Sequence, residues 1–226
     1  MPKKTSPTSK IQVLPSILAG DFGHLADEAK RAEEAGADAL HIDIMDGHFV
    51  PNFTLGSGAV AAINRSTSLF LDVHLMVYNP FDYIEQFVES GADRVTIHFE
   101  ATEEVEETLA YIRKCNAKAG LAFCPETSHE MMLKFFDKCD MILLMTVNPG
   151  FGGQKFIPDV LEKIAYAREM SGRYKLNLDI EVDGGIDDKT AQKCVQNGAN
   201  ILVSGTYLYK ASQMKDAIAK LRGAAS

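Results

Sequence analysis

Short apolar runs alternate with amphipathic stretches along the chain from Ile11 onward. The apolar runs have the length and residue types of buried strands, whereas the amphipathic stretches repeat their apolar positions at helical spacing. The pattern predicts strands over residues 13–18, 39–45, 69–76, 94–98, 119–124, 141–147, 176–182 and 201–204. It predicts helices over residues 20–35, 58–64, 80–90, 103–116, 128–138, 158–171, 187–197 and 212–221.

Eight strand–helix units within 226 residues are typical of a single-domain (β/α)8 TIM barrel, here expected to span residues 11–226. Residues 35–38, 90–93 and 197–200 repeat the pattern Gly-Ala followed by Asp or Asn, and each closes a predicted helix before a strand. Glycine is common there because a helix often ends in a residue with positive φ. A doubly wound open sheet is the alternative. It is less favoured because polar residues follow at least five strands rather than one switch point.

Acidic and imidazole side chains stand at or just after the C-terminal ends of three apolar strands. They are His41 and Asp43, Asp72 and His74, and Glu181 and Asp183. Residues two apart share a strand face, and charged groups are rarely buried unless they are paired or bound to a metal. We therefore expect one shared site, with a divalent ion (Zn, Fe(II), Mn or Co) held by His41, Asp43, His74 and Asp183. For any one strand alone, a buried His–Asp pair inside the core is the alternative.

Three methionines, Met45, Met76 and Met145, fall at strand C-terminal ends on the same predicted inward face. Methionine at alternate positions is usually plain core. Their place beside the predicted metal favours an apolar, polarisable lining of the site instead. Ser16, after the first strand, is the hydroxyl expected in the site, and His98 is expected to line the mouth without binding metal.

Small residues follow the last three predicted strands. They are Gly150, Gly152 and Gly153 around Phe151 after the sixth strand, Gly184 and Gly185 after the seventh, and Gly205 and Thr206 after the eighth. Glycine lets backbone N–H groups approach an anion, and barrel phosphate sites are commonly built from these loops. A flexible loop is the alternative for each one alone, but three adjacent loops favour a phosphate site.

The composition narrows the class of partner. A net charge of -8 argues against nucleic acid or an anionic membrane, so an anionic substrate must be held by local donors. Four scattered cysteines without a Cys-x-x-Cys pair predict a reduced, cytoplasmic setting. No apolar run approaches the ~20 residues that span a bilayer. Residues 1–10 are polar and are expected to form a disordered tail rather than an export signal.

With these motifs in place, the chain resembles the ribulose-phosphate 3-epimerase family from about Ile11 to the last helix. The matching motifs are residues 15–18, 41–52, 72–76, 147–156 and 181–186. The resemblance implies a metal-dependent interconversion of D-ribulose 5-phosphate and D-xylulose 5-phosphate in the pentose phosphate pathway, by an enzyme that commonly forms homo-oligomers.

The resemblance also implies residue roles. Asp43 and Asp183 would be the two acid/base groups and, with His41 and His74, the metal ligands. Ser16 and His74 would touch the sugar. The phosphate would lie against Gly150–Gly153, Gly184, Gly185, Gly205 and Thr206. Thr206 stands where the family usually has Ser, which keeps the hydroxyl.

Three rivals remain. Allulose-6-phosphate 3-epimerases have the same scaffold, with Ala and Ser where this chain has Gly152 and Gly185, which favours the five-carbon substrate. Related lyases need an Asp-x-Lys-x-x-Asp strand, whereas Asp43 is followed by Met45 and Asp46 without a lysine. From another class, a catalytically silent sugar-phosphate-binding barrel would have no need of four converging metal ligands.

Overall fold

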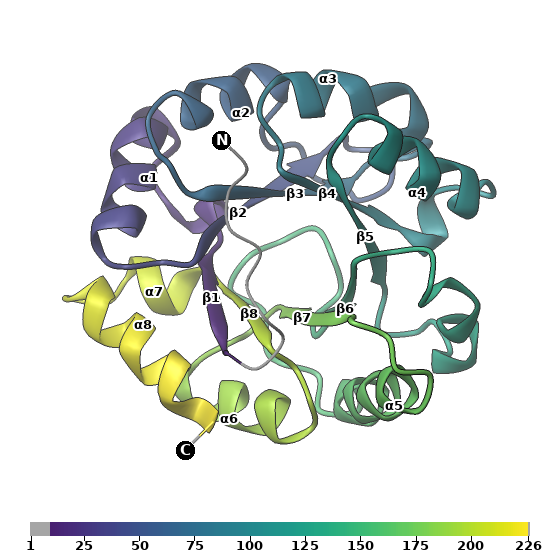
Figure 1. Ribbon diagram of the computed structural model, residues 1–226. Helices are drawn as coiled ribbons and strands as arrows, with labels where there is room; N and C mark the ends of the chain where they lie inside the picture. Colours follow the sequence, from purple (N-terminus) through teal and green to yellow (C-terminus); the bar gives the residue numbers. More distant parts are fainter. Residues whose placement is uncertain (1–9, 226) are drawn as a thin grey trace.

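A computed structural model describes residues 10–225, in which eight parallel strands form a ring surrounded by helices (Figure 1). The predicted single-domain TIM barrel is therefore confirmed. The tail expected over residues 1–10 lies, apart from Lys10, outside the described residues.

The strands follow one another around the ring in chain order. They are β1 (Gln12–Pro15), β2 (Ala39–Met45), β3 (Phe70–Met76), β4 (Arg94–His98), β5 (Lys118–Phe123), β6 (Met141–Met145), β7 (Asp179–Asp183) and β8 (Ile201–Ser204). Parallel ladders join every neighbouring pair from β2 to β8 and then β8 to β1. Between β1 and β2, a parallel bridge of Ser16 with His41 and backbone and side-chain bonds of Val13 with Asp38 complete the ring.

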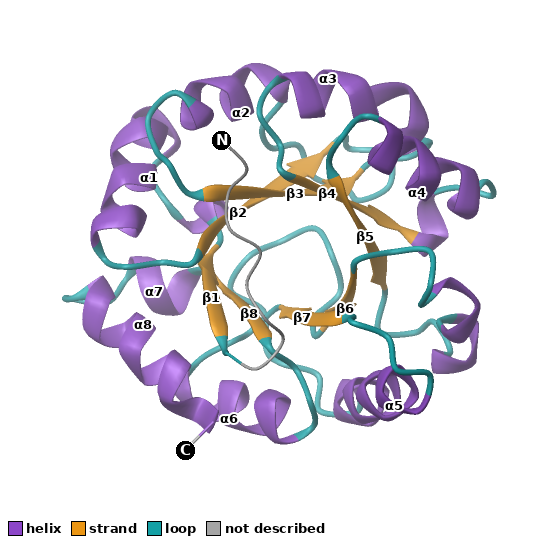
Figure 2. Cartoon of the chain, viewed as in Figure 1, coloured by secondary structure: helices purple, strands orange, loops and turns teal. Residues whose placement is uncertain are grey.

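Helices form the outer layer (Figure 2). The α-helices are α1 (Leu25–Glu34), α2 (Ser57–Asn64), α3 (Ile84–Glu89), α4 (Val105–Lys114), α5 (Val160–Arg173), α6 (Asp188–Gln196), α7 (Thr206–Tyr209) and α8 (Met214–Arg222). Short 3-10 turns lie at Ile17–Ala19, Phe22–His24, Pro80–Tyr83, Phe99–Ala101, His129–Met131, Leu133–Phe135 and Gly223–Ala225. Both faces of the strands are covered, so all of β2 is buried, and this is why the strands appear as nearly continuous apolar runs.

The helix predicted over residues 128–138 is wrong. Two 3-10 turns occupy this segment, and Met132, Phe135 and Phe136 point from it into the core. Spacings of three and four bury these side chains equally well from 3-10 turns, so the apolar pattern could not separate the two conformations. The first strand is also shorter than predicted, and the short helix α7 after β8 was not predicted.

The Gly-Ala-Asp repeats hold the N-terminal end of the barrel together. Gly36 and Gly91 have positive φ values of 83° and 109° where α1 and α3 end. The acids that follow accept hydrogen bonds from strand starts, Asp38 from the Val13 N–H and Asp93 from the Leu71 N–H. The repeat therefore stabilises the end of the barrel opposite to the polar strand ends. None of the helices in residues 10–225 is long and apolar enough to cross a membrane.

Candidate active site

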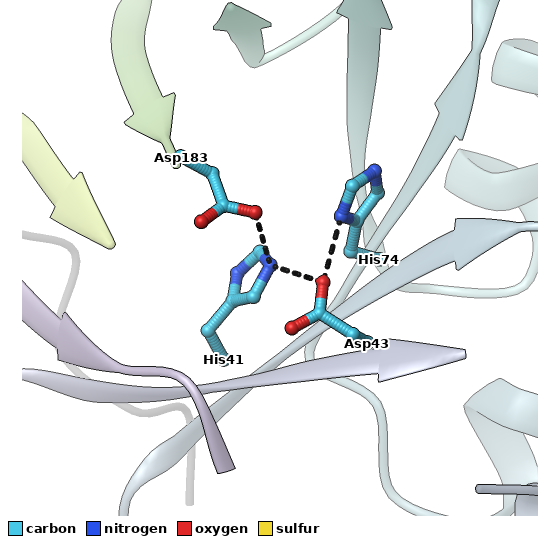
Figure 3. Close-up of side chains that lie close together, drawn as sticks. All are labelled: His41, Asp43, His74 and Asp183. Atoms are coloured by element: carbon cyan, nitrogen blue, oxygen red, sulfur yellow. Dashed lines mark hydrogen bonds and ion pairs between the residues drawn. The ribbon is translucent and has the colours of Figure 1, made fainter. Parts of the chain in front are cut away.

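Four side chains from β2, β3 and β7 converge at the C-terminal end of the barrel (Figure 3). Asp43 Oδ1 lies 3.3 Å from His41 Nε2 and 3.1 Å from His74 Nδ1. Asp183 Oδ2 lies 3.9 Å from His41 Nε2. The structure thus brings together the four residues that the strand pattern assigned to one site.

The donor atoms of this cluster fit a divalent ion. His41 Nε2 is buried and has no hydrogen-bond partner within residues 10–225, while His41 Nδ1 lies 2.9 Å from Asp72 Oδ2. An imidazole that donates from Nδ1 leaves its Nε2 lone pair free, here toward Asp43 and Asp183. Tetrahedral ligands about 2.0 Å from zinc lie about 3.3 Å from one another, close to the distances above. Two imidazoles and two carboxylates at this spacing therefore make a candidate metal site.

The two carboxylates have opposite pKa shifts. At Asp43, burial is outweighed by the imidazoles of His41 and His74, which hold its pKa well below the usual range. At Asp183, burial and the Asp43 carboxylate act in the same direction and raise the pKa to about 7. The ionised form of Asp43 is also favoured by Ser16, whose Oγ donates to Asp43 Oδ2 at 2.6 Å. Near neutral pH one carboxylate is ionised and the other can hold a proton.

The two imidazoles also differ. Burial opposes a charge on His41, but the Asp43 and Asp72 carboxylates overcome it and raise the pKa of His41 well above its usual value. Burial, with help from His98, lowers the pKa of His74 to about 4. His74 is therefore neutral near pH 7, as a metal ligand must be, whereas a cation binding at His41 would displace a proton.

A second charged layer lies deeper in the barrel. Asp72 Oδ1 accepts from Arg94 Nε at 2.6 Å, and Arg94 Nη2 donates to Glu181. Asp72 and Glu181 were expected in the same site as Asp183, but they contact Arg94 and the Nδ1 side of His41 instead. Arg94 supplies the positive charge that these carboxylates require.

A cavity of about 780 Å³ opens above the carboxylates. Its walls include these residues predicted for substrate binding: Ser16, Met45, Met76, Met145, Gly150, Phe151, Gly152, Gly153, Gly184, Gly185, Gly205 and Thr206. Asp43 and Asp183 also line it. His41 and His74 are fully buried and do not belong to the wall as described, so substrate contact by His74 stays a prediction.

The three predicted methionines lie together with the carboxylates in the cavity wall. Met45 and Met76 pack with Val50, and all three methionines are at most 5% exposed. Their side chains therefore give the carboxylate end of the cavity an apolar rim.

Glycine forms the other end of the cavity. Gly153 and Gly185 have φ values of 75° and 63°, and the N–H groups of Gly152, Gly153 and Gly185 donate to no protein acceptor within the described range. A Cβ on Gly185 would lie 2.8 Å from the Phe156 nitrogen, whereas a Cβ on Gly152 would meet nothing within 4 Å. Backbone donors are thus exposed to the cavity, and at Gly185 only glycine fits.

Several residues of the site were not predicted. Lys155 and Lys210 bring positive charge to the cavity wall, but exposed lysines are too common to mark a site in a sequence. Asn52, on the loop after β2, donates to the Gly150 carbonyl at 2.8 Å and fixes the glycine loop. The expectation that His98 lines the mouth is wrong, because it is fully buried behind His74.

A TIM barrel with paired carboxylates and glycine loops at the C-terminal ends of its strands has the layout of a barrel enzyme acting on a phosphorylated small molecule. The sequence profile of the ribulose-phosphate 3 epimerase family matches residues 12–209. The chain belongs to this family, which confirms both the resemblance drawn from the motifs and the expectation of an enzyme.

Curated relatives support the assignment over almost the whole chain. The ribulose-phosphate 3-epimerase of Chlamydia pneumoniae is 54% identical over 217 residues, covering 94% of this chain and 95% of the relative. The ribulose-phosphate 3-epimerase of Bacillus subtilis is 47% identical over 214 residues, covering 94% of this chain and 99% of the relative.

Solved structures of other barrels share the fold at low identity. A mutant tryptophan synthase alpha-subunit from Pyrococcus furiosus has a TM-score of 0.70 and 17% identity, covering 96% of this chain and 97% of that one. KGPDC from Streptococcus mutans has a TM-score of 0.70 and 12% identity, covering 96% and 98%. These similarities concern the barrel alone.

Proposed function

We propose that the protein epimerises carbon 3 of D-ribulose 5-phosphate to give D-xylulose 5-phosphate, using Asp43 and Asp183 as its two proton carriers. The observation that carries the proposal is the pair itself, two carboxylates in one cavity with pKa shifts in opposite directions. Environments that separate the pKa values of two neighbouring groups are the usual mark of an acid and a base.

Inversion at carbon 3 requires removal of a proton from one face and return of a proton to the other. The ionised Asp43 accepts the proton from the ribulose epimer, and Ser16 Oγ holds the carboxylate in place. Asp183 donates a proton to the opposite face. For the reverse reaction the two residues exchange roles.

His41, Asp43, His74 and Asp183 would hold one divalent ion, Zn, Fe(II), Mn or Co, since each of these suits mixed imidazole and carboxylate ligands. When bound, the ion supplies Lewis acidity that stabilises negative charge on the sugar oxygens. Water is excluded from this end of the cavity by Met45, Met76 and Met145. This protects the enediolate, the species left when carbon 3 loses its proton, from solvent protons.

The sugar phosphate would lie at the glycine end, against the loops after β6, β7 and β8. The unpaired N–H groups of Gly152, Gly153 and Gly185 support this placement, because a chain of net charge -8 must bind an anion through local donors. Binding energy from the phosphate orients carbon 3 between the two carboxylates.

Exchange at carbon 3 in heavy water tests the proposal. Ribulose 5-phosphate should gain deuterium at carbon 3 and yield xylulose 5-phosphate, both followed by NMR. Unphosphorylated ribulose should react far more slowly, because it lacks the remote anchor. Equal turnover of both sugars would contradict the phosphate placement.

The same experiment separates the rivals. Faster exchange with allulose 6-phosphate than with ribulose 5-phosphate would assign a six-carbon substrate. Binding of ribulose 5-phosphate without any exchange would indicate a silent barrel.

A further inference from the structure

His74 is the inner member of a chain of buried polar side chains. His74 Nε2 lies 2.8 Å from His98 Nε2, and the ring planes are 26° apart with centroids 4.9 Å from each other. His98 Nδ1 lies 3.2 Å from Glu100 Oε2. In Figure 3 the Nε2 atom of His74 points away from His41, Asp43 and Asp183.

Glu100 is itself held in place from β5 and the loop beyond it. Its Oε1 accepts from the Cys124 N–H at 2.8 Å and from Thr127 Oγ1. Lys163 of α5 donates to the carbonyls of Cys124, Pro125 and Thr127 and so fixes this loop. The carboxylate of Glu100 is therefore anchored by the loop that follows β5.

The proton positions on His74 and His98 follow if His74 Nδ1 is a metal ligand, and this step rests on the metal site proposed above. A neutral imidazole that offers the Nδ1 lone pair to a metal carries its proton on Nε2. That proton can only be donated to His98 Nε2, which must then be the unprotonated nitrogen of its ring. The remaining proton of His98 lies on Nδ1 and is donated to Glu100.

Two other roles for this cluster fit less well. His98, Glu100 and Cys124 lie close enough to hold a metal of their own. However, both Glu100 oxygens already accept hydrogen bonds, and burial followed by the Glu100 carboxylate raises the pKa of the Cys124 thiol far above neutral. Simple packing would not need two imidazole nitrogens facing each other at 2.8 Å, since without a shared proton they would repel.

We infer that His98 and Glu100 are positioning residues, which fix the tautomer and orientation of His74 through a relay from Glu100 to His98 to His74. His41 has the corresponding partner in Asp72, which accepts directly from its Nδ1. Partners of this kind orient metal-binding histidines and raise their basicity, and their loss typically costs 10–100-fold in metal affinity.

Two amide substitutions at position 98, His98→Gln and His98→Asn, test the relay. The measured quantity is the Co²⁺ affinity, obtained by chelator competition and from the visible absorption of the bound ion. Gln places its amide near the Nε2 position of the imidazole and can still accept from His74. Asn reaches only the Nδ1 position and cannot. His98→Asn should therefore weaken Co²⁺ binding roughly 10–100-fold, and His98→Gln should restore most of it.

Glu100→Gln should weaken Co²⁺ binding less than His98→Asn, because the amide oxygen can still accept from His98 but the charge is lost. Glu103→Gln is the matched control. It removes the same charge from an exposed position on the same connection and should bind Co²⁺ like the parent. Nitrogen-15 NMR of histidine-labelled, Zn²⁺-loaded protein should show His98 protonated on Nδ1 and bare on Nε2.

Parent-like Co²⁺ affinity in His98→Asn, or no recovery in His98→Gln, would overturn the relay while leaving the proposed metal site intact. A proton on His98 Nε2 in the Zn²⁺-loaded protein would do the same. A parent protein that binds no Co²⁺ would instead overturn the metal site, and the relay with it.

Discussion

The two ends of the cavity present charge in different ways. At the carboxylate end, ionisable side chains such as Asp43 and Asp183 converge from buried strands. At the glycine end, backbone N–H groups on loops are open to the cavity, and the side chains of Lys155 and Lys210 add fixed positive charge. Chemistry that moves protons requires groups that titrate, whereas binding of a permanent anion requires only fixed donors. Substitutions at the carboxylate end should therefore mainly lower kcat, whereas substitutions at the glycine end should mainly raise KM.

The largest effect is expected from removing a proton carrier. Asp43→Asn and Asp183→Asn should each reduce kcat by at least ~10³-fold, because no other group serves the same face of the sugar. Metal content must be measured in parallel, since each residue is also a proposed ligand. Asp188→Asn, at an exposed position on α6, is the control and should leave kcat unchanged. Turnover near the parent value in either site variant would contradict the two-carrier mechanism.

Removal of metal should have the next largest effect. Exhaustive chelation is expected to reduce kcat by at least ~100-fold, because Lewis-acid stabilisation contributes several kcal/mol. Re-addition of Zn²⁺, Mn²⁺ or Co²⁺ should restore activity and raise Tm, with ~2.7 kcal/mol of stabilisation at a hundred times Kd. Full activity in protein shown by elemental analysis to be metal-free would contradict the site.

At the glycine end, Gly185→Ala should raise KM by roughly 10-fold with a smaller loss of kcat. A Cβ there meets the Phe156 nitrogen at 2.8 Å and requires a φ of 63°, so the loop must shift and cost about 1–2 kcal/mol. Metal affinity should not change. Gly172→Ala, at an exposed position on α5, is the control, since a Cβ there meets nothing within 4 Å. If Gly185→Ala altered metal affinity and left KM unchanged, the two ends would not be separable in this way.

The last prediction concerns stability in acid rather than activity, and it depends on Glu100. Hydrogen bonds from His98, Thr127 and Cys124 outweigh burial and lower the pKa of Glu100 to about 2 from an ordinary 4.5. A lowered folded-state pKa stabilises the protein above pH 4.5, and this contribution is lost as pH falls toward 2. Glu100→Gln should be roughly 2–3 kcal/mol less stable at pH 7 and should show a flatter acid limb in urea unfolding. An unchanged acid limb would contradict this assignment.

The carboxylate end was easier to predict from the sequence than its supporting residues. His41, Asp43 and His74 stand out because polar groups inside apolar strands are rare. Glu100 and its link to His98 could not be predicted, because the turn after β4 places the carboxylate and contacts from the loop after β5 hold it. Long-range contacts of this kind leave no periodicity in a sequence.

The fold was predictable where burial dictated periodicity and less so where several conformations satisfy the same burial. All eight strands were found because both of their faces are covered. The turns around Phe135 match the sequence pattern of a helix because they bury residues at helical spacing. The sequence pattern indicates that Asp72 and Glu181 are charged groups inside the barrel, but it does not give their depth. The depth of an inward-facing side chain depends on the stagger of the strands around the ring.

The seam between β1 and β2 has a consequence for folding kinetics. It joins the first strand of the barrel to the second, and Ser16 contributes both the bridge to His41 and the hydroxyl bound to Asp43. A chain that has not yet docked its first strand lacks this support for the proton carrier as well as a closed ring. Recovery of turnover during refolding should therefore follow docking of β1, so that an enzyme assay reports closure of the ring.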